Sequence, residues 1–178
     1  MSMSEQIGFA EYVALRRDTW VRAACLLTAD PHTAEDLVQT VLVRVWPRWE
    51  RIIAQGDPDA YIRKVLMNVF LTSLRRRRWR EVSADPHALH LAPQHQPAAP
   101  APIDGVEARL DLRHVLAGLG PRQRAVLVLR YYLDLSEAET AQTLGCSVGT
   151  VKSQAAKASA HLRSRIEATD REATKERP

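Results

Sequence analysis

The segment 136–163, SEAETAQTLGCSVGTVKSQAAKASAHLR, constrains the fold more strongly than any other part of the chain. Ser136 and Glu139 form an S-x-x-E capping box, which predicts that a helix begins at Ser136. Gly145 ends this helix, because glycine adopts the left-handed C-cap conformation without a side-chain clash. Ser147 can cap a second helix directly after it. Two short helices joined by a tight, glycine-containing turn predict a helix-turn-helix, whose second helix usually enters the major groove of DNA.

The second helix of this segment carries charge of one sign. Between Ser147 and Ile166 the chain has four Lys or Arg residues and no acid. The four are Lys152, Lys157, Arg163 and Arg165. Such an excess of positive charge suits the phosphate backbone of DNA. The alternative is an ordinary helical hairpin with a solvated basic face, and it stays open because short motifs produce false positives.

The composition of the chain favours a cytoplasmic protein with a polyanionic partner. Its 178 residues are enough for one domain or two small ones, and a 46% share of hydrophobic residues allows a core. The net charge of +4 and the pI of about 9.4 favour a polyanion. Cys25 and Cys146 lie far apart, so we expect reduced structural thiols. We expect neither a secretory signal in residues 1–10 nor a membrane-spanning stretch.

Two helices are predicted before residue 47. Segment 6–28 has apolar residues on one helical stripe. Asp30 followed by Pro31 is a strong helix-start signal, and Pro47 should end the second helix near Trp46. The polar side of that second helix begins with Glu35, Asp36 and Gln39. These residues either stabilise only the first turn, where the helix dipole favours acids, or form a surface for a partner.

A third helix is predicted after a loop over residues 47–57. Asp57 and Pro58 repeat the cap-then-proline signal, and the helix should continue to about Arg80. Between Asp59 and Glu81 it has seven basic residues and no acid. Phe70, Trp79 and Asn68 are interleaved with these charges. Basic side chains mixed with flat or amide groups suit a nucleic-acid surface, whereas the helix dipole would explain only Arg75–Arg78.

The middle of the chain separates this part from the helix-turn-helix. Residues 83–105 contain five prolines and no helical or strand period, which predicts a flexible linker. His87, His90 and His95 lie there without a Cys or acid cluster, so we expect no metal and no cofactor. From Val106 an amphipathic helix should run to Gly118-Leu119-Gly120, and Pro121 should begin another with Arg122, Arg124 and Arg130 outward. Its inward residues are predicted to be Ala125, Val126, Leu129, Tyr132 and Leu133.

The sequence therefore predicts an all-α fold of two small helical domains joined by a Pro-rich linker. The expected boundaries are 1–82 for the first domain, 83–105 for the linker, 106–166 for the second domain and 167–178 for a disordered tail. Each domain has a basic helix, so the natural inference is a nucleic-acid binder with two sites. A tether raises the effective concentration of the second site when its length matches the span.

Three segments together resemble a known family. They are AEDLVQTVLVRVWPRW (34–49), AYIRKVLMNVFLTSLRRRR (60–78) and LGPRQRAVLVLRYYLDLSEAETAQTLGCSVGTVKSQ (119–154). They are similar to conserved regions 2 and 4 of bacterial sigma-70 factors, in the extracytoplasmic-function (ECF) class and its actinobacterial SigE-like branch. The resemblance covers most of the chain outside the linker and tail, in the right order. It implies a protein without enzymatic activity that binds core RNA polymerase, opens promoter DNA and initiates transcription.

The resemblance also implies the partners and site residues of the first domain. The polymerase contacts would be the clamp helices of the β′ subunit and the β flap. Residues matching the clamp-docking region are Glu35, Asp36, Leu37, Val38 and Gln39. Asn68 matches the position that holds a flipped-out base of the −10 element, and the loop from Trp49 to Asp57 matches its pocket. The full −10 set is Trp49, Asp57, Asn68, Thr72, Arg75, Arg76, Arg77 and Arg78.

The second domain would read the −35 element. The matching residues are Arg130, Ser147, Thr150, Lys152, Ser153, Gln154, Ala156 and Lys157. Gln154 and Ala156 stand where an Arg and an aromatic residue are frequent, and Gln pairs with adenine whereas Arg pairs with guanine. The family's −35 sequence therefore cannot be carried over. Pro47 likewise departs from the usual basic residue beside the pocket loop.

The length of the linker is compatible with two promoter elements. Its 23 residues reach at most roughly 75 Å at ~3.3 Å each. A family-type spacer of about 17 base pairs spans roughly 58 Å. The inhibitory N-terminal domain of primary sigma factors has no match, so the resemblance implies that any restraint comes from a separate anti-sigma protein or from the level of synthesis.

Two other functions are alternatives to this interpretation. A stand-alone regulator that binds an operator through its helix-turn-helix would explain residues 119–166. It would not explain Asn68 on its acid-free helix or the face formed by Glu35, Asp36 and Gln39. An enzyme is a more distant alternative, because the sequence has no Ser, His and Asp group, no Gly-rich phosphate loop and no metal spacing.

Overall fold

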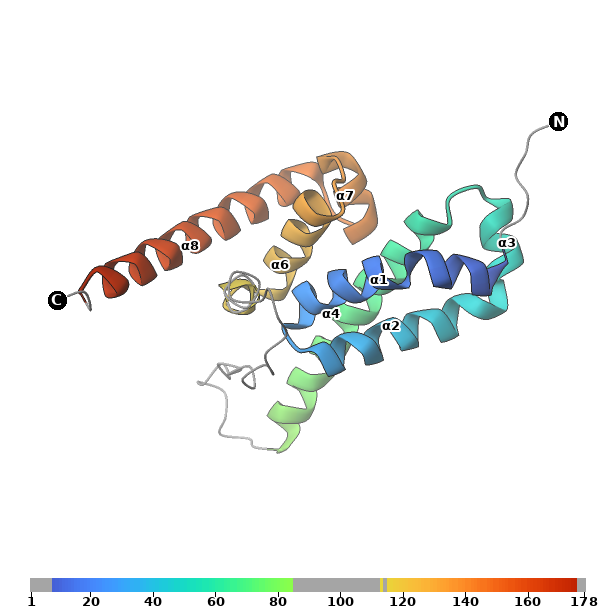
Figure 1. Cartoon of the computed structure of the whole chain (residues 1–178), viewed down its shortest axis with the longest axis horizontal. Helices are drawn as coiled ribbons and strands as arrows, with labels where there is room; N and C mark the ends of the chain where they lie inside the picture. The colour runs from blue at the N-terminus through green and yellow to red at the C-terminus, as the bar shows by residue number, and fades with distance from the viewer. Residues whose placement is uncertain (1–7, 85–112, 114, 176–178) are drawn as a thin grey trace. The chain divides into compact units, whose positions relative to one another are not determined.

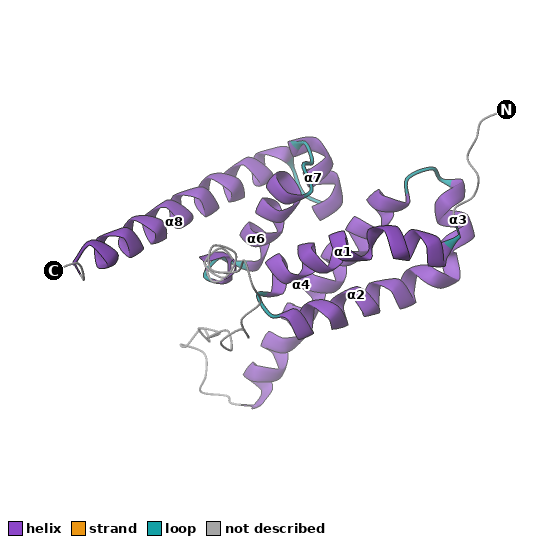
Figure 2. Ribbon diagram, viewed as in Figure 1, coloured by secondary structure: helices purple, strands orange, loops and turns teal. Residues whose placement is uncertain are grey.

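The computed structural model describes residues 8–84, 113 and 115–175. The chain divides into unit 1, Met1–Gln94, and unit 2, His95–Pro178, and each unit is described by itself. All elements of the described residues are helical, with no strand among them (Figure 2). The predicted all-α class is thereby confirmed. The three linker histidines and residues 85–105 of the predicted linker lie outside the described residues, whereas Ser83 and Ala84 belong to a helix.

Within residues 8–84, unit 1 has three long helices and a short helical connection (Figure 1). The elements are α1 (Phe9–Thr28), α2 (Pro31–Val45), the 3-10 turn Trp46–Arg48, α3 (Trp49–Ala54) and α4 (Pro58–Ala84). Helix α2 packs against both α1 and α4. The predicted start signals are confirmed, because Asp30 accepts a hydrogen bond from the Thr33 N–H (2.7 Å) and Asp57 accepts one from the Ala60 N–H (2.8 Å).

The connection between α2 and α4 is helical and not the predicted loop. Trp49 and Ile52, three residues apart, are both buried, and this spacing places them on one helical face toward the core. The Trp49 ring lies 5.2 Å from the Phe9 ring and 4.9 Å from the Tyr12 ring, measured between centroids. Burial of these aromatic groups stabilises a helix of only six residues, which its local sequence would not hold alone.

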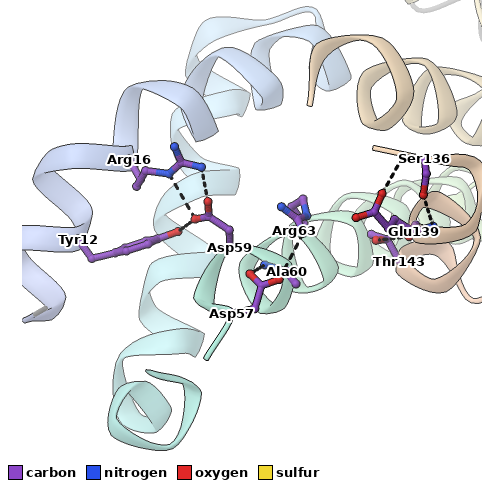
Figure 3. A network of polar contacts seen from close by, with 9 residues as sticks. All are labelled: Tyr12, Arg16, Asp57, Asp59, Ala60, Arg63, Ser136, Glu139 and Thr143. Atoms are coloured by element: carbon purple, nitrogen blue, oxygen red, sulfur yellow. Dashed lines mark hydrogen bonds and ion pairs between the residues drawn. The ribbon is translucent and has the colours of Figure 1, made fainter. Parts of the chain in front are cut away.

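A polar network joins α1 to the first turn of α4 (Figure 3). The Tyr12 hydroxyl and the Arg16 guanidinium both donate hydrogen bonds to the Asp59 carboxylate. The Trp20 Nε1–H donates to the Tyr12 hydroxyl at 3.3 Å, so the network reaches the buried centre of α1. Burial, and next the hydrogen bond to Asp59, raise the pKa of the Tyr12 phenol above its ordinary value. Tyr12 therefore stays protonated and acts as a donor.

Unit 2 contains the predicted helix-turn-helix and two helical segments before it. Residues 115–117 are helical and are followed by α6 (Pro121–Leu127), α7 (Glu137–Leu144) and α8 (Val148–Lys175). Between α6 and α7 the segment Val128–Tyr132 forms a π-helical turn, in which the Leu133 N–H donates to the Val128 carbonyl at 3.0 Å. The wider turn rotates the residues after Leu129 about the axis. Tyr132, predicted to face inward, is therefore exposed.

The end of α8 differs from the predicted disordered tail. The helix continues to Lys175, so residues 167–175 are helical, and only residues 176–178 of the predicted tail lie outside the described residues. The tail was predicted to be disordered because it has almost no apolar residue. Its Ala, Glu, Lys and Arg residues nevertheless favour helix, and an existing helix extends at low cost because nucleation has already occurred.

Candidate nucleic-acid interface

The caps of the helix-turn-helix are formed as predicted. The Glu139 N–H donates to Ser136 Oγ at 3.2 Å, and the Ser136 N–H donates to the Glu139 carboxylate at 2.8 Å (Figure 3). Gly145 has φ of 62°, the left-handed value that glycine adopts most easily. The Thr150 N–H then donates to Ser147 Oγ at 3.1 Å, which caps α8. Local sequence signals therefore fix both ends of the turn.

Small residues pack the motif together. Val126, Ala141 and Val151 form its buried cluster, one each from α6, α7 and α8. Leu144, Cys146 and Ala155 pack around this cluster. Short side chains at the crossing allow the helix axes to approach closely, so α8 is held rigidly against α6 and α7. Ala138 and Val148, also in the motif, are exposed.

Arg124 was predicted to point outward from α6 but has a structural position. Its guanidinium donates hydrogen bonds to the Ala117 carbonyl (2.8 Å) and to the Leu119 carbonyl (3.1 Å). Burial lowers the pKa of Arg124 below its ordinary value. Arg124 therefore joins α6 to the end of the preceding helical segment, and is not available to a phosphate.

The outer face of α8 presents most of the predicted −35 residues. Lys152, Ser153, Ala156 and Lys157 are exposed, and Gln154 is half-buried. At the N-terminus Ser147 is exposed and its hydroxyl lies 2.9 Å from that of the half-buried Thr150. Arg130 differs from these residues because its side chain is already engaged within unit 2. Its guanidinium donates to the Leu135 carbonyl and lies 5.9 Å from the centre of the Tyr131 ring. Arg130 therefore closes the turn between the π-helical segment and α7 in the unbound protein.

Helix α4 presents a second polar face. Asn68, Thr72, Arg75 and Arg76 are all exposed, and their spacing of four, seven and eight residues places them on one side of the helix. Arg77 and Arg78 continue the helix, but their side chains are outside the described residues. Asp57 caps α4, and its carboxylate lies 3.9 Å from the Arg63 guanidinium. Phe70, expected among the charges for stacking, is instead buried at 2% exposure.

Three predicted site residues belong to the core. Trp49 and Leu37 are each 7% exposed, and Val38 is 2% exposed. Trp49 packs on the aromatic rings of α1, and the other two lie on the buried face of α2. The unbound protein covers these three side chains, and their contacts with DNA or polymerase stay a prediction. The sequence match identified a segment without distinguishing the two faces of its helix.

The exposed face of α2 includes residues that the sequence reasoning missed. Asp36 and Gln39 are exposed as expected, while Glu35 forms an ion pair with Arg17 of α1. Val43 follows on the same helical face and is 69% exposed, and Trp46 at the helix end is 61% exposed. Exposed apolar groups that lie next to one another form a patch, and such patches can mark a protein-binding surface. Val43 lies four residues after Gln39, and Trp46 lies three residues after Val43, so this helical spacing was the signal in the sequence.

Known protein families match two separate parts of the chain. The family model "Sigma-70 region 2" matches residues 13–80, and "Sigma-70, region 4" matches residues 109–162. These ranges include the α4 face and the helix-turn-helix respectively. No helix in the described ranges has the length and apolar character that a membrane crossing requires.

Individual relatives extend over nearly the whole chain. The chain is 39% identical to the RNA polymerase sigma-E factor of Streptomyces avermitilis over 97% of its own length and 93% of the relative. It is 40% identical to the RNA polymerase sigma-E factor of Streptomyces coelicolor, over 96% of this chain and 93% of the relative. It is 34% identical to the ECF RNA polymerase sigma factor SigG of Mycobacterium tuberculosis (strain H37Rv), over 82% of the chain but only 45% of that relative.

Solved structures share the fold. The sigma factor RpoE, in its complex with the anti-sigma factor NepR from Bartonella quintana, is 25% identical with a TM-score of 0.68, over 89% of this chain and 96% of that one. CnrH, in complex with the cytosolic domain of CnrY, has a TM-score of 0.57 at 23% identity, over 90% of this chain and 88% of CnrH. The chain therefore belongs to the sigma-70 family, as an RNA polymerase sigma factor of the ECF class that is similar to the actinobacterial sigma-E factors.

Proposed function

We propose that unit 1 binds core RNA polymerase and opens the −10 element while unit 2 binds the −35 element. The observation that carries this proposal is the pair of exposed polar helix faces, one on α4 and one on α8, each within a matched sigma-70 region. The protein then acts by binding and positioning, with no chemistry and no small-molecule substrate of its own. Because polymerase and promoter meet in the bacterial cytoplasm, the protein acts there.

Polymerase docking is assigned to the exposed face of α2. Asp36 and Gln39 provide polar contacts, and Val43 with Trp46 provides apolar area beside them. Protein interfaces combine a central apolar or aromatic anchor with polar groups around it. This surface replaces the predicted one that included Leu37 and Val38, which are buried. Glu35 takes part only if its ion pair with Arg17 opens.

Opening of the −10 element is assigned to the exposed face of α4. An extruded base costs on the order of a few kcal/mol of lost stacking and pairing, which contacts to the flipped base can offset. The Asn68 amide can both donate and accept hydrogen bonds at a base edge. Arg75 and Arg76, about two turns away on the same side, can then contact backbone phosphates.

Reading of the −35 element is assigned to α8. Lys152 and Lys157 provide positive charge for phosphates, while Gln154 has an amide suited to adenine. Ser147 and Thr150 lie at the helix N-terminus, where backbone N–H groups favour an anion. Arg130 can add a backbone contact if it exchanges the Leu135 carbonyl for a phosphate.

Regulation by an anti-sigma protein is part of the proposal. The Bartonella quintana relative has such a partner in its solved complex, and the fold is shared at a TM-score of 0.68. A protein that covered the α2 face would block polymerase docking, since Val43 and Trp46 are the most exposed apolar groups of that face. This mode of restraint needs no change inside the sigma factor.

Run-off transcription with purified core polymerase tests the proposed function. Genomic fragments selected by the reconstituted holoenzyme serve as templates. A transcript that starts at a defined position, and only when the protein is present, is the expected result. Operator-like binding to the same fragments without any effect on polymerase would instead support the stand-alone regulator.

A further inference from the structure

We propose that Glu137 of α7 determines specificity by restraining Lys152 of the DNA-reading helix, which weakens binding to DNA of arbitrary sequence. The inference rests on the proposed DNA-binding role of unit 2. Glu137 is the first residue of α7, and Lys152 lies in the first turns of α8. The Glu137 carboxylate lies 3.5 Å from the Lys152 ammonium, so the pair joins the two helices of the motif.

The exposure of the pair argues against a purely structural role. The side chain of Lys152 is 64% exposed and that of Glu137 is 39% exposed. Solvent screens ion pairs of this kind, and they contribute little to folding stability. The motif is held by its buried cluster of Val126, Ala141 and Val151 instead. The pair lies where the outer face of α8 would meet DNA, so its main electrostatic effect is on that encounter.

The two acids in the first turn of α7 have different positions. The Glu139 carboxylate accepts the Ser136 N–H and belongs to the capping box. The Glu137 carboxylate reaches across to α8. A helix N-terminus favours any acid through its dipole, and that effect accounts for either residue being acidic. It does not account for one of them meeting a lysine on the recognition helix.

Exchange of partners connects this contact to specificity. On DNA of arbitrary sequence, phosphates supply almost all of the attraction. While it stays paired with Glu137, Lys152 neutralises none of them, so the native protein makes one phosphate contact fewer. On the correct sequence, base-edge contacts from residues such as Gln154 offset this penalty. A penalty that falls mainly on the wrong DNA increases discrimination.

The test compares E137Q with D134N in the full-length chain. Both substitutions remove one negative charge, and Asp134 lies only three residues earlier. Asp134 is exposed with φ of 52°, a conformation that Asn tolerates well, and the described residues provide no cation paired with it. Binding to a short duplex of mixed sequence is measured over a range of salt concentrations. For E137Q we expect tighter binding. We also expect the plot of the logarithm of the binding constant against the logarithm of the salt concentration to have a slope that is steeper by about 0.9, which corresponds to one additional phosphate contact.

Several results would overturn the inference. An unchanged slope for E137Q would overturn it, as would an equal change for D134N, which would indicate a general effect of net charge. Addition of K152Q must cancel the gain, so E137Q/K152Q should bind mixed DNA no better than K152Q alone. Absence of binding by both the native chain and E137Q would also contradict it.

Holoenzyme measurements separate this inference from the proposed function. On a promoter that the native protein uses, E137Q should give a lower ratio of specific to non-specific transcript than D134N. If the native protein initiates normally but the two variants give the same ratio, only the role of Glu137 is lost. If the native protein gives no promoter-specific transcript, the proposed function itself fails.

Discussion

The phenol hydroxyl of Tyr12, in α1, donates a hydrogen bond to the carboxylate of Asp59, in the first turn of α4. Arg16, one turn further along α1, donates to the same carboxylate. One acid thus holds α1 against the start of the helix that carries Asn68. The sequence contained no motif for this contact, because its partners are 47 and 43 residues apart.

Replacement of Tyr12 by Phe should lower the free energy of unfolding of unit 1 by about 1 kcal/mol. The change removes one hydrogen bond and leaves the Trp20 N–H without its acceptor. Asp59 keeps its ion pair with Arg16, so the loss should stay moderate. Urea unfolding followed by fluorescence measures the effect. Tyr61→Phe is the control, since Tyr61 is half-buried and no described residue hydrogen-bonds to its hydroxyl. An equal loss in both variants would contradict the role of the network.

Replacement of Asp30 by Ala should destabilise the protein by about 1 kcal/mol at neutral pH, because α2 loses its N-cap. Hydrogen bonds from Thr33 hold the pKa of Asp30 below its ordinary value of 3.8. A lowered folded-state pKa stabilises the protein above the unfolded pKa, and this stabilisation disappears as the pH falls through the folded value. The difference between native protein and Asp30→Ala should therefore shrink below about pH 4.

Asp30→Asn is the matched control for that experiment. Asn accepts the same hydrogen bond from the Thr33 N–H but has no charge to titrate. Its stability relative to Asp30→Ala should thus stay constant with pH. Urea midpoints measured from pH 3 to pH 7 decide the matter, and a pH-independent difference between native protein and Asp30→Ala would refute the assignment.

Replacement of Asn68 by Ala should impair promoter opening without affecting assembly with polymerase. Asn68 is exposed, so truncation leaves the core intact while removing the amide proposed to hold the extruded base. Permanganate reactivity of unpaired thymines measures opening, and it should fall about tenfold or more if the lost contact is worth ~1.4 kcal/mol or more. Gln142→Ala removes an exposed amide from α7 in unit 2 and serves as control. Normal opening by Asn68→Ala would remove Asn68 from this role.

Replacement of Asp36 by Arg should weaken binding to core polymerase about tenfold or more, because reversal of a charge on the proposed docking face disturbs the electrostatic complementarity of the interface. Asp36 is exposed on the α2 face proposed for docking. Asp18→Arg makes the same change of charge at an exposed position on α1, outside that face, and should have little effect. Fluorescence anisotropy of labelled protein with core polymerase measures the two affinities. Equal affinities for the two variants would return Asp36 to a role in stabilising the first turn of α2.

The sequence by itself determined where most helices begin and end. Asp30, Asp57, Ser136 and Ser147 cap helices at the predicted positions, and Gly145 adopts the predicted left-handed conformation. These signals act within three or four residues, so no tertiary structure is needed to interpret them. The sequence also located the two candidate surfaces on α4 and α8, because runs of basic residues without acids can be recognised directly.

Only the tertiary structure decided which sides of those helices are accessible. Trp49, Leu37 and Phe70 were expected at or near interfaces but are buried, whereas Val43 and Trp46, which the predicted site did not include, are exposed. Burial depends on which neighbours cover a residue, and neither helical period nor composition specifies a neighbour that is distant in the chain. For the same reason, the contacts of Asp59 with α1 and of Glu137 with Lys152 became visible only once the helices were packed.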